Sequence, residues 1–410
     1  MGKNQNNIIV GLDIGTTKVC AIVGQRTNGS TNVIGIGTYP SEGLRKGVVV
    51  NIESTVNSLR KAIEEAELMA GSEIHSVCTG ISGSHIKGFN SLGVIAIKNR
   101  EVKNNDVRRV IDAAKAIAIP IDREVIHILP QEFIVDDQDG IKEPVGMIGV
   151  RLETRVHIVT GATNMKQNII KCADRIGLNI SDIVLEQLAS SKATLSADEK
   201  ELGVILLDIG GGTTDIAIFS KRKLKHTSVL SLGGDYVTSD IAVGLRTPMN
   251  EAEKIKKKYG CAFPELVNRD ETIEVPSVGG RAPRILPRIQ LCEIIEPRME
   301  EIFSLVKREL IKSNCDGLMA SGIVITGGSA LLEGLPELGE SVFNLPVRVG
   351  YPMGIEGLSD VVNNPMYSTG VGLLLYGSNG LNTNEFKQKD KNILGRASNR
   401  FKQWFEEAFL

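Results

Sequence analysis

The sequence predicts an α/β protein with two lobes that are built around a duplicated unit. Residues 10–19 read Val-Gly-Leu-Asp-Ile-Gly-Thr-Thr-Lys-Val, and residues 206–217 read Leu-Leu-Asp-Ile-Gly-Gly-Gly-Thr-Thr-Asp-Ile-Ala. Each copy is an apolar run, a carboxylate, a glycine turn, two hydroxyl residues and a second apolar run, which predicts two strands joined by a tight turn. Residues 322–330, Gly-Ile-Val-Ile-Thr-Gly-Gly-Ser-Ala, predict a third strand that ends in a glycine turn.

Length and composition favour a soluble multidomain protein. The chain has 410 residues, is 42% hydrophobic and carries a net charge of −2, so no overall positive field points to nucleic acid. No apolar run approaches the ~18 residues of a spanning helix, and the N-terminus lacks the apolar segment of a signal peptide. The six cysteines form no CxxC pair and the five histidines no HExxH motif, so we expect reduced thiols in the cytoplasm and no zinc site.

The elements of the first half follow from periodicity and from turn residues. Alternating apolar residues predict strands, apolar residues spaced three and four apart predict helices, and glycine after such a stretch predicts its end. Residues 84–162 lack a clear pattern around one helix and are interpreted as an inserted subdomain. The expected strands are 8–12, 19–23, 33–38, 74–80 and 180–185, and the expected helices are 53–69, 107–119 and 168–177.

The second half repeats this alternation. The second hairpin spans 203–219, strands continue to residue 229, and a charged helix spans 251–259. Residues 269–288 are rich in Pro, Gly and Arg and predict an exposed loop or hairpin. A long helix is expected over 290–313, with a kink or break at Pro297, and a further helix after residue 330. Residues 378–392 are polar, without hydrophobic period, and predict a disordered linker.

The two hairpins have the chemistry of a nucleotide phosphate site. Glycine allows a turn to aim backbone N–H groups at a phosphate, and nearby hydroxyls donate to phosphate oxygens. The hydroxyl residues of the two turns are Thr16, Thr17, Thr213 and Thr214. Asp13 and Asp208 precede the turns and are interpreted as carboxylates that hold Mg²⁺ through water, which suits a cation that keeps part of its water shell. The alternative role of these two aspartates is to cap the turn backbone.

The order of the three glycine units is similar to that of the superfamily of actin, hexokinase and heat-shock chaperone ATPases. Within that superfamily the chain resembles the bacterial cell-division FtsA family over nearly its whole length. The resemblance rests on Pro-Ser-Glu-Gly at 40–43, Ile-Leu-Pro-Gln-Glu at 128–132, Glu-Val-Pro-Ser-Val-Gly-Gly-Arg at 274–281, Glu-Pro-Arg at 296–298 and Tyr-Ser-Thr-Gly-Val-Gly-Leu-Leu at 367–374. It implies an actin-like fold of two lobes with duplicated ribonuclease-H-like domains, an inserted subdomain and a C-terminal amphipathic helix.

The resemblance also implies how the chain is divided between these parts. The first lobe core would take 1–83, 163–200 and 361–377, with the inserted subdomain at 84–162. The second lobe core would take 201–229 and 302–360, and its outer subdomain, which would bind FtsZ, 230–301. A flexible linker at 378–392 and an amphipathic membrane-targeting helix at 393–410 would follow.

The resemblance implies ATP and Mg²⁺ as cofactors and assigns residues to them. The β- and γ-phosphates would contact Gly15, Thr16, Thr17 and Lys18 on one side and Gly210, Gly211, Gly212, Thr213 and Thr214 on the other. The base and ribose would lie against Gly327, Gly328 and Ser329. Glu253 and Lys256 share one helix face, which resembles a nucleoside-contacting pair or is an ordinary solvated surface.

Hydrolysis needs a group that orients or deprotonates the attacking water. The resemblance places this group at the start of the helix after strand 180–185, where the chain has Glu186 and Gln187. Gln187 replaces a proline that many ATPases of the superfamily have at this position. We therefore expect ATP binding with at most weak ATPase activity, and mainly an adaptor role.

The last residues have the pattern of a helix that lies in the membrane interface. Four of the seventeen residues in 394–410 are Phe or Trp, although the whole chain has only 4% aromatic residues. From 387 to 402 there are six basic residues and one acidic residue, which anionic lipid would attract. The alternative is a terminal helix packed on the protein core. The residues expected at the membrane are Phe401, Trp404, Phe405, Phe409, Arg396, Arg400 and Lys402.

The resemblance implies three kinds of partner and a location. The C-terminal tail of FtsZ would bind the outer subdomain, with Arg298 and Glu301 as candidate contacts, and copies of the chain would assemble into protofilaments. Later division proteins would bind residues 84–162. The protein would tether the FtsZ ring to the cytoplasmic face of the inner membrane at the division site. The alternative function is a sugar-type kinase of the same superfold, although no sugar-kinase Asp motif is visible.

Overall fold

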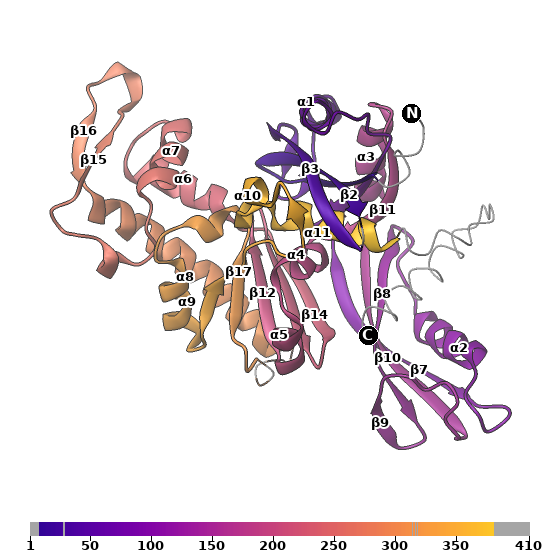
Figure 1. The fold of residues 1–410 in the computed structure, drawn as a ribbon. Helices are drawn as coiled ribbons and strands as arrows, with labels where there is room; N and C mark the ends of the chain where they lie inside the picture. Colours follow the sequence, from indigo (N-terminus) through magenta and orange to yellow (C-terminus); the bar gives the residue numbers. More distant parts are fainter. Residues whose placement is uncertain (1–7, 28, 314, 316, 318, 381–410) are drawn as a thin grey trace.

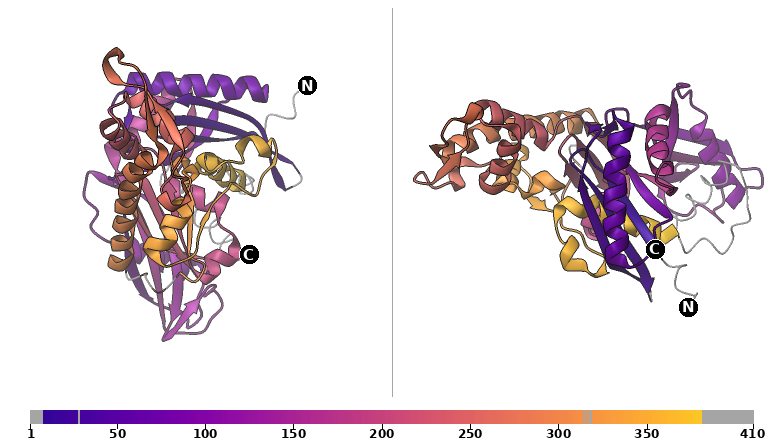
Figure 2. Two further views of the ribbon diagram at one scale, coloured as in Figure 1. Left: turned by 90° about the vertical axis from the view of Figure 1, so that its left-hand side faces the viewer. Right: turned by 90° about the horizontal axis from the view of Figure 1, so that it is seen from above.

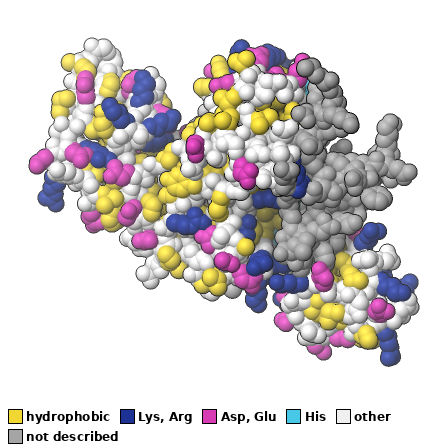
Figure 3. Space-filling model, viewed as in Figure 1, with side chains coloured by type: hydrophobic (Ala, Val, Ile, Leu, Met, Phe, Trp, Pro, Cys, Tyr) yellow, Lys and Arg dark blue, Asp and Glu magenta, His cyan; other side chains and the backbone are white. Residues whose placement is uncertain are grey.

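The computed structural model describes residues 8–27, 29–313, 315, 317 and 319–380. The described chain forms two lobes, each built on one mixed sheet, with further elements at the two ends of the molecule (Figure 1). The α/β class that the sequence predicts is confirmed. On the face shown in Figure 3, basic and acidic side chains are interspersed, with hydrophobic side chains between them.

The first lobe has a six-stranded sheet in the order β11-β6-β1-β2-β3-β19. Strands β1, β2 and β3 form an antiparallel meander, and β6 and β11 add parallel strands beside β1. The strands are β1 (Ile8–Ile14), β2 (Lys18–Thr27), β3 (Ser30–Pro40), β6 (Ser76–Ile81), β11 (Asn179–Leu185) and β19 (Glu356–Gly357), with a small hairpin of β4 (Leu44–Arg45) and β5 (Val48–Val49). The helices are α1 (Ile52–Ala70), α3 (Thr163–Asp174), α4 (Glu186–Thr194), α5 (Ala197–Leu202), α10 (Ser359–Val362) and α11 (Ser368–Gly380).

Helices α1 and α11 cover opposite faces of this sheet. Side chains alternate between the faces of a strand, so Val23 of β2 packs with α1 and Ile22 with α11. Glycine allows both helices to approach closely: a Cβ on Gly37 would lie 2.0 Å from the Ala62 carbonyl oxygen of α1. The first lobe therefore places the β1–β2 turn at a fixed position between two packed layers.

The second lobe repeats the plan of the first. Its sheet has the order β14-β13-β12-β17-β18, in which β12, β13 and β14 form an antiparallel meander and β17 and β18 add parallel strands. The duplication in the sequence thus corresponds to two sheets with the same arrangement of antiparallel and parallel strands. The strands are β12 (Val204–Ile209), β13 (Thr214–Ser220), β14 (Lys223–Leu230), β17 (Ile323–Thr326) and β18 (Val347–Val349).

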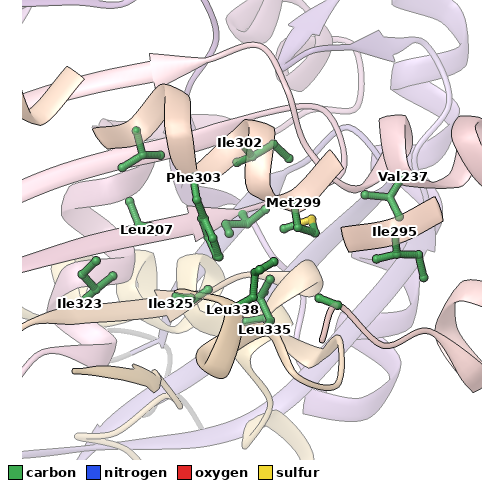
Figure 4. Close-up of a cluster of buried hydrophobic side chains, with 14 of the residues drawn as sticks. Leu207, Val237, Ile295, Met299, Ile302, Phe303, Ile323, Ile325, Leu335 and Leu338 are labelled. Atoms are coloured by element: carbon green, nitrogen blue, oxygen red, sulfur yellow. The ribbon is translucent and has the colours of Figure 1, made fainter. Parts of the chain in front are cut away.

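The core of the second lobe lies between its sheet and two helices, α8 (Arg288–Lys312) and α9 (Leu335–Phe343). Figure 4 shows Phe303 of α8 among side chains of strands β12 and β17 and of helix α9, including Leu207, Ile325 and Leu338. All four are at most 1% exposed. Full burial of a side chain of this size contributes about 1.5–3 kcal/mol, so this cluster anchors the strands that end at the candidate site.

Helix α8 corrects one expectation from the sequence. The sequence predicted a kink or a break at Pro297. The break is wrong, because the structure has one continuous helix of 25 residues with Pro297 inside it; the kink stays a prediction. Buried side chains on both sides of Pro297, such as Ile295 and Met299, pack into the same core. Packing of both halves against one core outweighs the backbone hydrogen bond that proline removes.

The outer subdomain extends from the second lobe at one end of the molecule. It contains α6 (Gly234–Gly244), α7 (Met249–Tyr259), the first part of α8, and an antiparallel hairpin of β15 (Thr272–Val275) and β16 (Arg284–Pro287). The hairpin falls in the segment 269–288, where the sequence predicted an exposed loop or hairpin. Figure 2 shows this subdomain and the inserted segment at opposite ends of the molecule.

The inserted segment has a sheet of its own in the order β7-β10-β8-β9. Its elements are β7 (Lys87–Ala96), α2 (Asn104–Lys115), β8 (Arg123–Val135), β9 (Gln138–Ile141) and β10 (Arg151–Ala162). Helix α2 spans Asn104–Lys115, whereas the sequence predicted a helix over 107–119. The Asp106 carboxylate accepts from the Lys103 N–H at 3.1 Å and fixes the start, whereas Pro120 disfavours helix in the residue before it.

Two boundaries near the C-terminal end differ from the expectation. The helix expected after residue 330 is α9, which follows a short 3₁₀ turn (Gly328–Leu331). Strand β19 already joins the first sheet before the expected boundary at residue 361. Helix α11 runs through Gly380, so Ser378 belongs to it and not to a linker. The Ser378 hydroxyl is buried and lies 2.9 Å from the Thr31 hydroxyl. Residues 381–392 of the expected linker and the expected helix at 393–410 lie outside the described residues. None of the described helices is both long and apolar enough to cross a membrane.

Candidate functional site

The two glycine hairpins face each other across a cavity of about 490 Å³ between the lobes. A Cβ on Gly211 would lie 2.3 Å from the Thr17 methyl group, and a Cβ on Gly212 would lie 2.6 Å from the Thr16 hydroxyl. Only glycine therefore allows the β12–β13 turn to approach the β1–β2 turn this closely. The cavity is lined by both turns, by Glu186, and by residues of the outer subdomain and of the β17 turn.

The two turns share one backbone arrangement. In the first, the Gly15 N–H donates to the Lys18 carbonyl at 3.0 Å, and in the second the Gly210 N–H donates to the Thr213 carbonyl at 2.9 Å. The Lys18 ammonium group lies 3.8 Å from the Asp13 carboxylate and donates to the Met366 carbonyl at 2.6 Å. Lys18 thus places a positive charge beside the Asp13 carboxylate on the first-lobe side of the cavity.

The third glycine turn closes another side of the cavity. Gly327 has φ of +86°, and a Cβ on it would lie 2.5 Å from the Asp208 carboxylate and 2.7 Å from the Ile209 carbonyl oxygen. The Ser329 hydroxyl donates to the Gly210 carbonyl at 3.3 Å. The β17 turn is therefore packed directly against the β12–β13 turn, with Gly328 beside the cavity.

Helix α7 supplies the Glu253–Lys256 pair to the same cavity. The Lys256 ammonium group lies 2.7 Å from the Glu253 carboxylate and donates to the Gly234 carbonyl at 3.0 Å and to the Thr238 hydroxyl at 2.8 Å. The Lys256 side chain is only 15% exposed. The pair therefore connects α7 to the start of α6 and borders the cavity.

Four carboxyl groups converge on the phosphate side of the cavity, and burial raises the pKa of each. The pKa of Asp208 rises to about 6 and that of Asp215 to about 7, while Asp13 also rises although Lys18 opposes it. The pKa of Glu186 rises well above its ordinary value, first through burial and then through repulsion by the three aspartates. An added cation would lower all four values, so the site favours bound positive charge.

These carboxylates fit a water-mediated Mg²⁺ better than a direct protein cage. In the part of the chain that the structure describes, no three His, Cys, Asp or Glu side chains lie close enough to ligate one ion. Mg²⁺ usually keeps several waters and binds one or two carboxylates together with phosphates. Asp13 and Asp208 both border the cavity and would hold the ion, which would neutralise charge on phosphate oxygens.

Two of the predicted site residues do not border the cavity. Successive side chains of a helix point about 100° apart, so Glu186 faces the cavity whereas Gln187 is fully buried beside it. Because Gln187 does not border the cavity, the structure gives no support to the prediction that Gln187 positions the attacking water. Strand alternation has the same effect at β13: Thr213 faces the cavity, whereas the Thr214 hydroxyl donates to the Leu232 carbonyl at 2.8 Å.

The structure brings further residues to the cavity that the sequence analysis did not single out. Asp215 lies directly opposite Asp208 in the β12–β13 ladder, and the Ser82 hydroxyl of the first lobe donates to its carboxylate. The alternation that starts at Thr213 would have placed Asp215 on the cavity side. Asp235, whose pKa is raised by burial, and Thr369, whose hydroxyl donates to Asp208 at 2.9 Å, carry no local sequence signal.

Arg298 and Glu301 lie together on α8 but are already engaged within the chain. The Arg298 guanidinium donates to both carboxylate oxygens of Asp240 on α6, at 2.6 and 3.1 Å, and also to Glu301. A peptide that binds Arg298 would share it with these carboxylates. The seven residues expected at the membrane, Phe401, Trp404, Phe405, Phe409, Arg396, Arg400 and Lys402, lie outside the described residues.

Comparison with known proteins assigns the chain to a family. Residues 205–372 match the family model "Cell division protein FtsA", and residues 83–160 match "SHS2 domain inserted in FTSA". The chain is 57% identical over 371 residues to the cell division protein FtsA of Pseudomonas aeruginosa, which covers 90% of this chain and 89% of that protein.

Solved structures of low sequence identity share the fold. A PilM–PilN type IV pilus biogenesis complex matches with a TM-score of 0.65 at 17% identity, covering 90% of this chain and 98% of that chain. MreB5 of Spiroplasma citri bound to ADP matches with a TM-score of 0.59 at 15% identity, covering 93% and 99%. The fold is therefore actin-like, as the sequence resemblance implied. The two family models and the 57% identical relative show that the chain belongs to the FtsA family of cell division proteins.

Proposed function

We propose that this protein binds ATP with Mg²⁺ in the cavity between its lobes and acts in division as a membrane-bound polymeric adaptor. The observation that carries the nucleotide part is the pair of glycine turns that face each other, with Gly211 against Thr17 and Gly212 against Thr16. Their N–H groups and hydroxyls suit phosphates, and the carboxylates behind them suit a cation. The neighbour of the same fold, MreB5, is described as bound to ADP.

Turnover of the bound ATP is expected to be slow or negligible. Glu186 is the only one of the two candidate catalytic residues that borders the cavity, so this carboxyl group alone would have to position and deprotonate the attacking water. The nucleotide would then serve mainly to fix the two lobes relative to each other.

The adaptor part rests on the family and on the sequence pattern of the C-terminal residues. The protein would assemble into actin-like protofilaments, bind the FtsZ tail through its outer subdomain near Arg298 and Glu301, and bind later division proteins through residues 84–162. The helix expected at 393–410 would lie on the cytoplasmic face of the inner membrane. One such helix binds reversibly, but many on one polymer bind firmly because later insertions are intramolecular.

The experiment that tests the adaptor is sedimentation of FtsZ with vesicles that contain anionic lipid. We expect FtsZ to sediment only when the full-length protein is present, and a variant that lacks residues 393–410 to leave FtsZ in the supernatant. Fluorescence of Trp404, the only tryptophan, should shift to the blue when anionic vesicles are added. The double variant Phe405→Ser and Phe409→Ser, which keeps every charge, should lose vesicle binding by at least about 100-fold, since each buried Phe contributes ~1.5–3 kcal/mol.

Two matched controls separate the membrane claim from general effects. Replacing Asn399 and Gln403 by Ser alters the polar face of the same helix and should leave vesicle binding unchanged. Retention of the truncated protein on vesicles would contradict the membrane helix. Sedimentation of FtsZ with vesicles when this protein is omitted would contradict the adaptor role.

A further inference from the structure

Three side chains from both lobes come together at the rim of the cavity, next to the lining residues Gly47, Asp235 and Met299. The Lys46 ammonium group of the first lobe lies 5.2 Å from the centre of the Tyr236 ring, which belongs to α6 of the outer subdomain. The Arg298 guanidinium of α8 lies 5.6 Å from the same ring centre. A cation within about 6 Å of an aromatic ring is attracted by it, so the ring connects two cations that would otherwise repel each other.

Lys46 is held at this rim by the turn that also borders the phosphate side of the cavity. It has φ of +52°, and the N–H of its neighbour Gly47 donates to the Thr16 hydroxyl at 3.0 Å. A Cβ on Gly212 of the opposite lobe would lie 3.0 Å from the Lys46 Cα atom. Lys46 therefore keeps its distance to Tyr236 only while the two lobes are as close together as in this structure.

Arg298, the second cation beside Tyr236, is held within the outer subdomain. Arg298 is fixed by two hydrogen bonds to Asp240 of α6, the helix that carries Tyr236, and by one to Glu301. Tyr236 follows Asp235, which borders the cavity and would meet a Cβ on Gly211 at 2.8 Å. Asp235 and Tyr236 at the start of α6 thus contact the β12–β13 turn, Lys46 and Arg298.

From these contacts we infer that Lys46, Tyr236 and Arg298 form a clasp that holds the lobes closed over a bound nucleotide and slows its release. The inference rests on the proposed nucleotide site and adds a regulation to it. A ligand with acidic groups that draws Arg298 away from Tyr236 weakens the clasp and hastens nucleotide release. Where that ligand lowers the affinity for nucleotide, bound nucleotide lowers the affinity for the ligand by the same factor, because linkage is reciprocal in equilibrium affinity.

The test is the release rate of a fluorescent ATP analogue from the full-length protein, measured by displacement with excess ATP. Lys46→Gln and Tyr236→Leu should each hasten release about threefold to tenfold, the range expected for loss of the Lys46–Tyr236 contact between the lobes. The double variant should release no faster than the faster single variant, because both changes remove one interaction. Tyr236→Phe keeps the ring and should retain the wild-type rate.

The matched control is Lys258→Gln. Lys258 lies 4.8 Å from the centre of the Tyr259 ring within the outer subdomain, so it makes the same kind of contact without bridging the lobes. This variant should release nucleotide at the wild-type rate. Arg298→Gln should hasten release as Tyr236→Leu does, because it removes the second cation and the anchor to Asp240.

The outcomes separate the clasp from the nucleotide site on which it rests. A wild-type protein that binds no analogue contradicts the proposed function itself. A wild type that binds it, with Lys46→Gln and Tyr236→Leu releasing at the wild-type rate, contradicts the clasp. Equal acceleration by Lys258→Gln also contradicts it, because the effect would then not depend on a contact between the lobes. An unchanged rate in Arg298→Gln would contradict the inferred part of Arg298 in the clasp and the link to the candidate partner surface.

Discussion

Gly212→Val should weaken ATP binding by about 100-fold, equal to ~3 kcal/mol. Its Cβ would lie 2.6 Å from the Thr16 hydroxyl and 3.0 Å from the Lys46 Cα atom, so the new side chain pushes the two lobes apart. Displacement of the turns separates the N–H groups and hydroxyls that would bind the phosphates from both sides. The measurement is isothermal titration of ATP in the presence of Mg²⁺.

The matched control for this variant is Gly317→Val. A Cβ on Gly317 has no described heavy atom within 4 Å, so its substitution adds the same side chain without a steric conflict. This variant should bind ATP as the wild type does. Because Gly212 lies between buried strands, circular dichroism of both variants should accompany the titration. A folded Gly212→Val protein with wild-type ATP affinity would contradict the close approach of the two turns.

Asp215→Asn should stabilise the nucleotide-free protein at pH 8. Burial raises the pKa of Asp215 to about 7 in the folded chain, from an ordinary value of 3.8. Between these two values the folded state binds more protons than the unfolded state, so the free energy of unfolding falls as pH rises through this window. Above it the full cost of the buried charge is present, on the order of 4 kcal/mol. Asparagine removes this charge and should recover most of that free energy.

The measurement is urea unfolding without nucleotide or Mg²⁺ at pH 5 and pH 8. The wild type should be less stable at the higher pH, and Asp215→Asn should reduce that difference. Asp137→Asn is the control, because the Asp137 side chain is fully exposed and its substitution should change stability little at either pH. Failure of Asp215→Asn to gain stability at pH 8 would contradict the claim that the buried charge of Asp215 destabilises the nucleotide-free fold. Asp208, which would hold Mg²⁺, has a pKa of about 6, so Mg²⁺ binding should weaken as pH falls through 6, since protonated carboxyl groups bind cations poorly.

The duplicated hairpins show how much of the fold can be read from this sequence. Each carries its own turn chemistry, so the strands, the turns and their repetition follow from local residues, as β1–β2 and β12–β13 demonstrate. The helices were found from periodicity, but their ends depend on contacts that are distant or specific, such as Asp106 at the start of α2. The continuity of α8 through Pro297 depends on a core formed by residues from several parts of the second lobe.

The residues of the candidate site fall into the same two groups: some could be predicted from their neighbours in the sequence, and others reach the site only through contacts between distant segments. Residues in the glycine turns could be named because the turn itself signals phosphate chemistry. Thr214 and Gln187 were named with their neighbours, although strand alternation and helix rotation direct them away from the cavity. Thr369 and Ser82 could not have been found locally, because they reach Asp208 and Asp215 only after the chain has folded across both lobes.

The most direct test of the account is a calorimetric titration of the full-length wild type with ATP, with Mg²⁺ and then with the Mg²⁺ removed by a chelator. The two facing turns and the carboxylates behind them predict one ATP per chain, bound more tightly when Mg²⁺ is present. No saturable binding at millimolar ATP would contradict the account, and so would an affinity that does not change when Mg²⁺ is withdrawn.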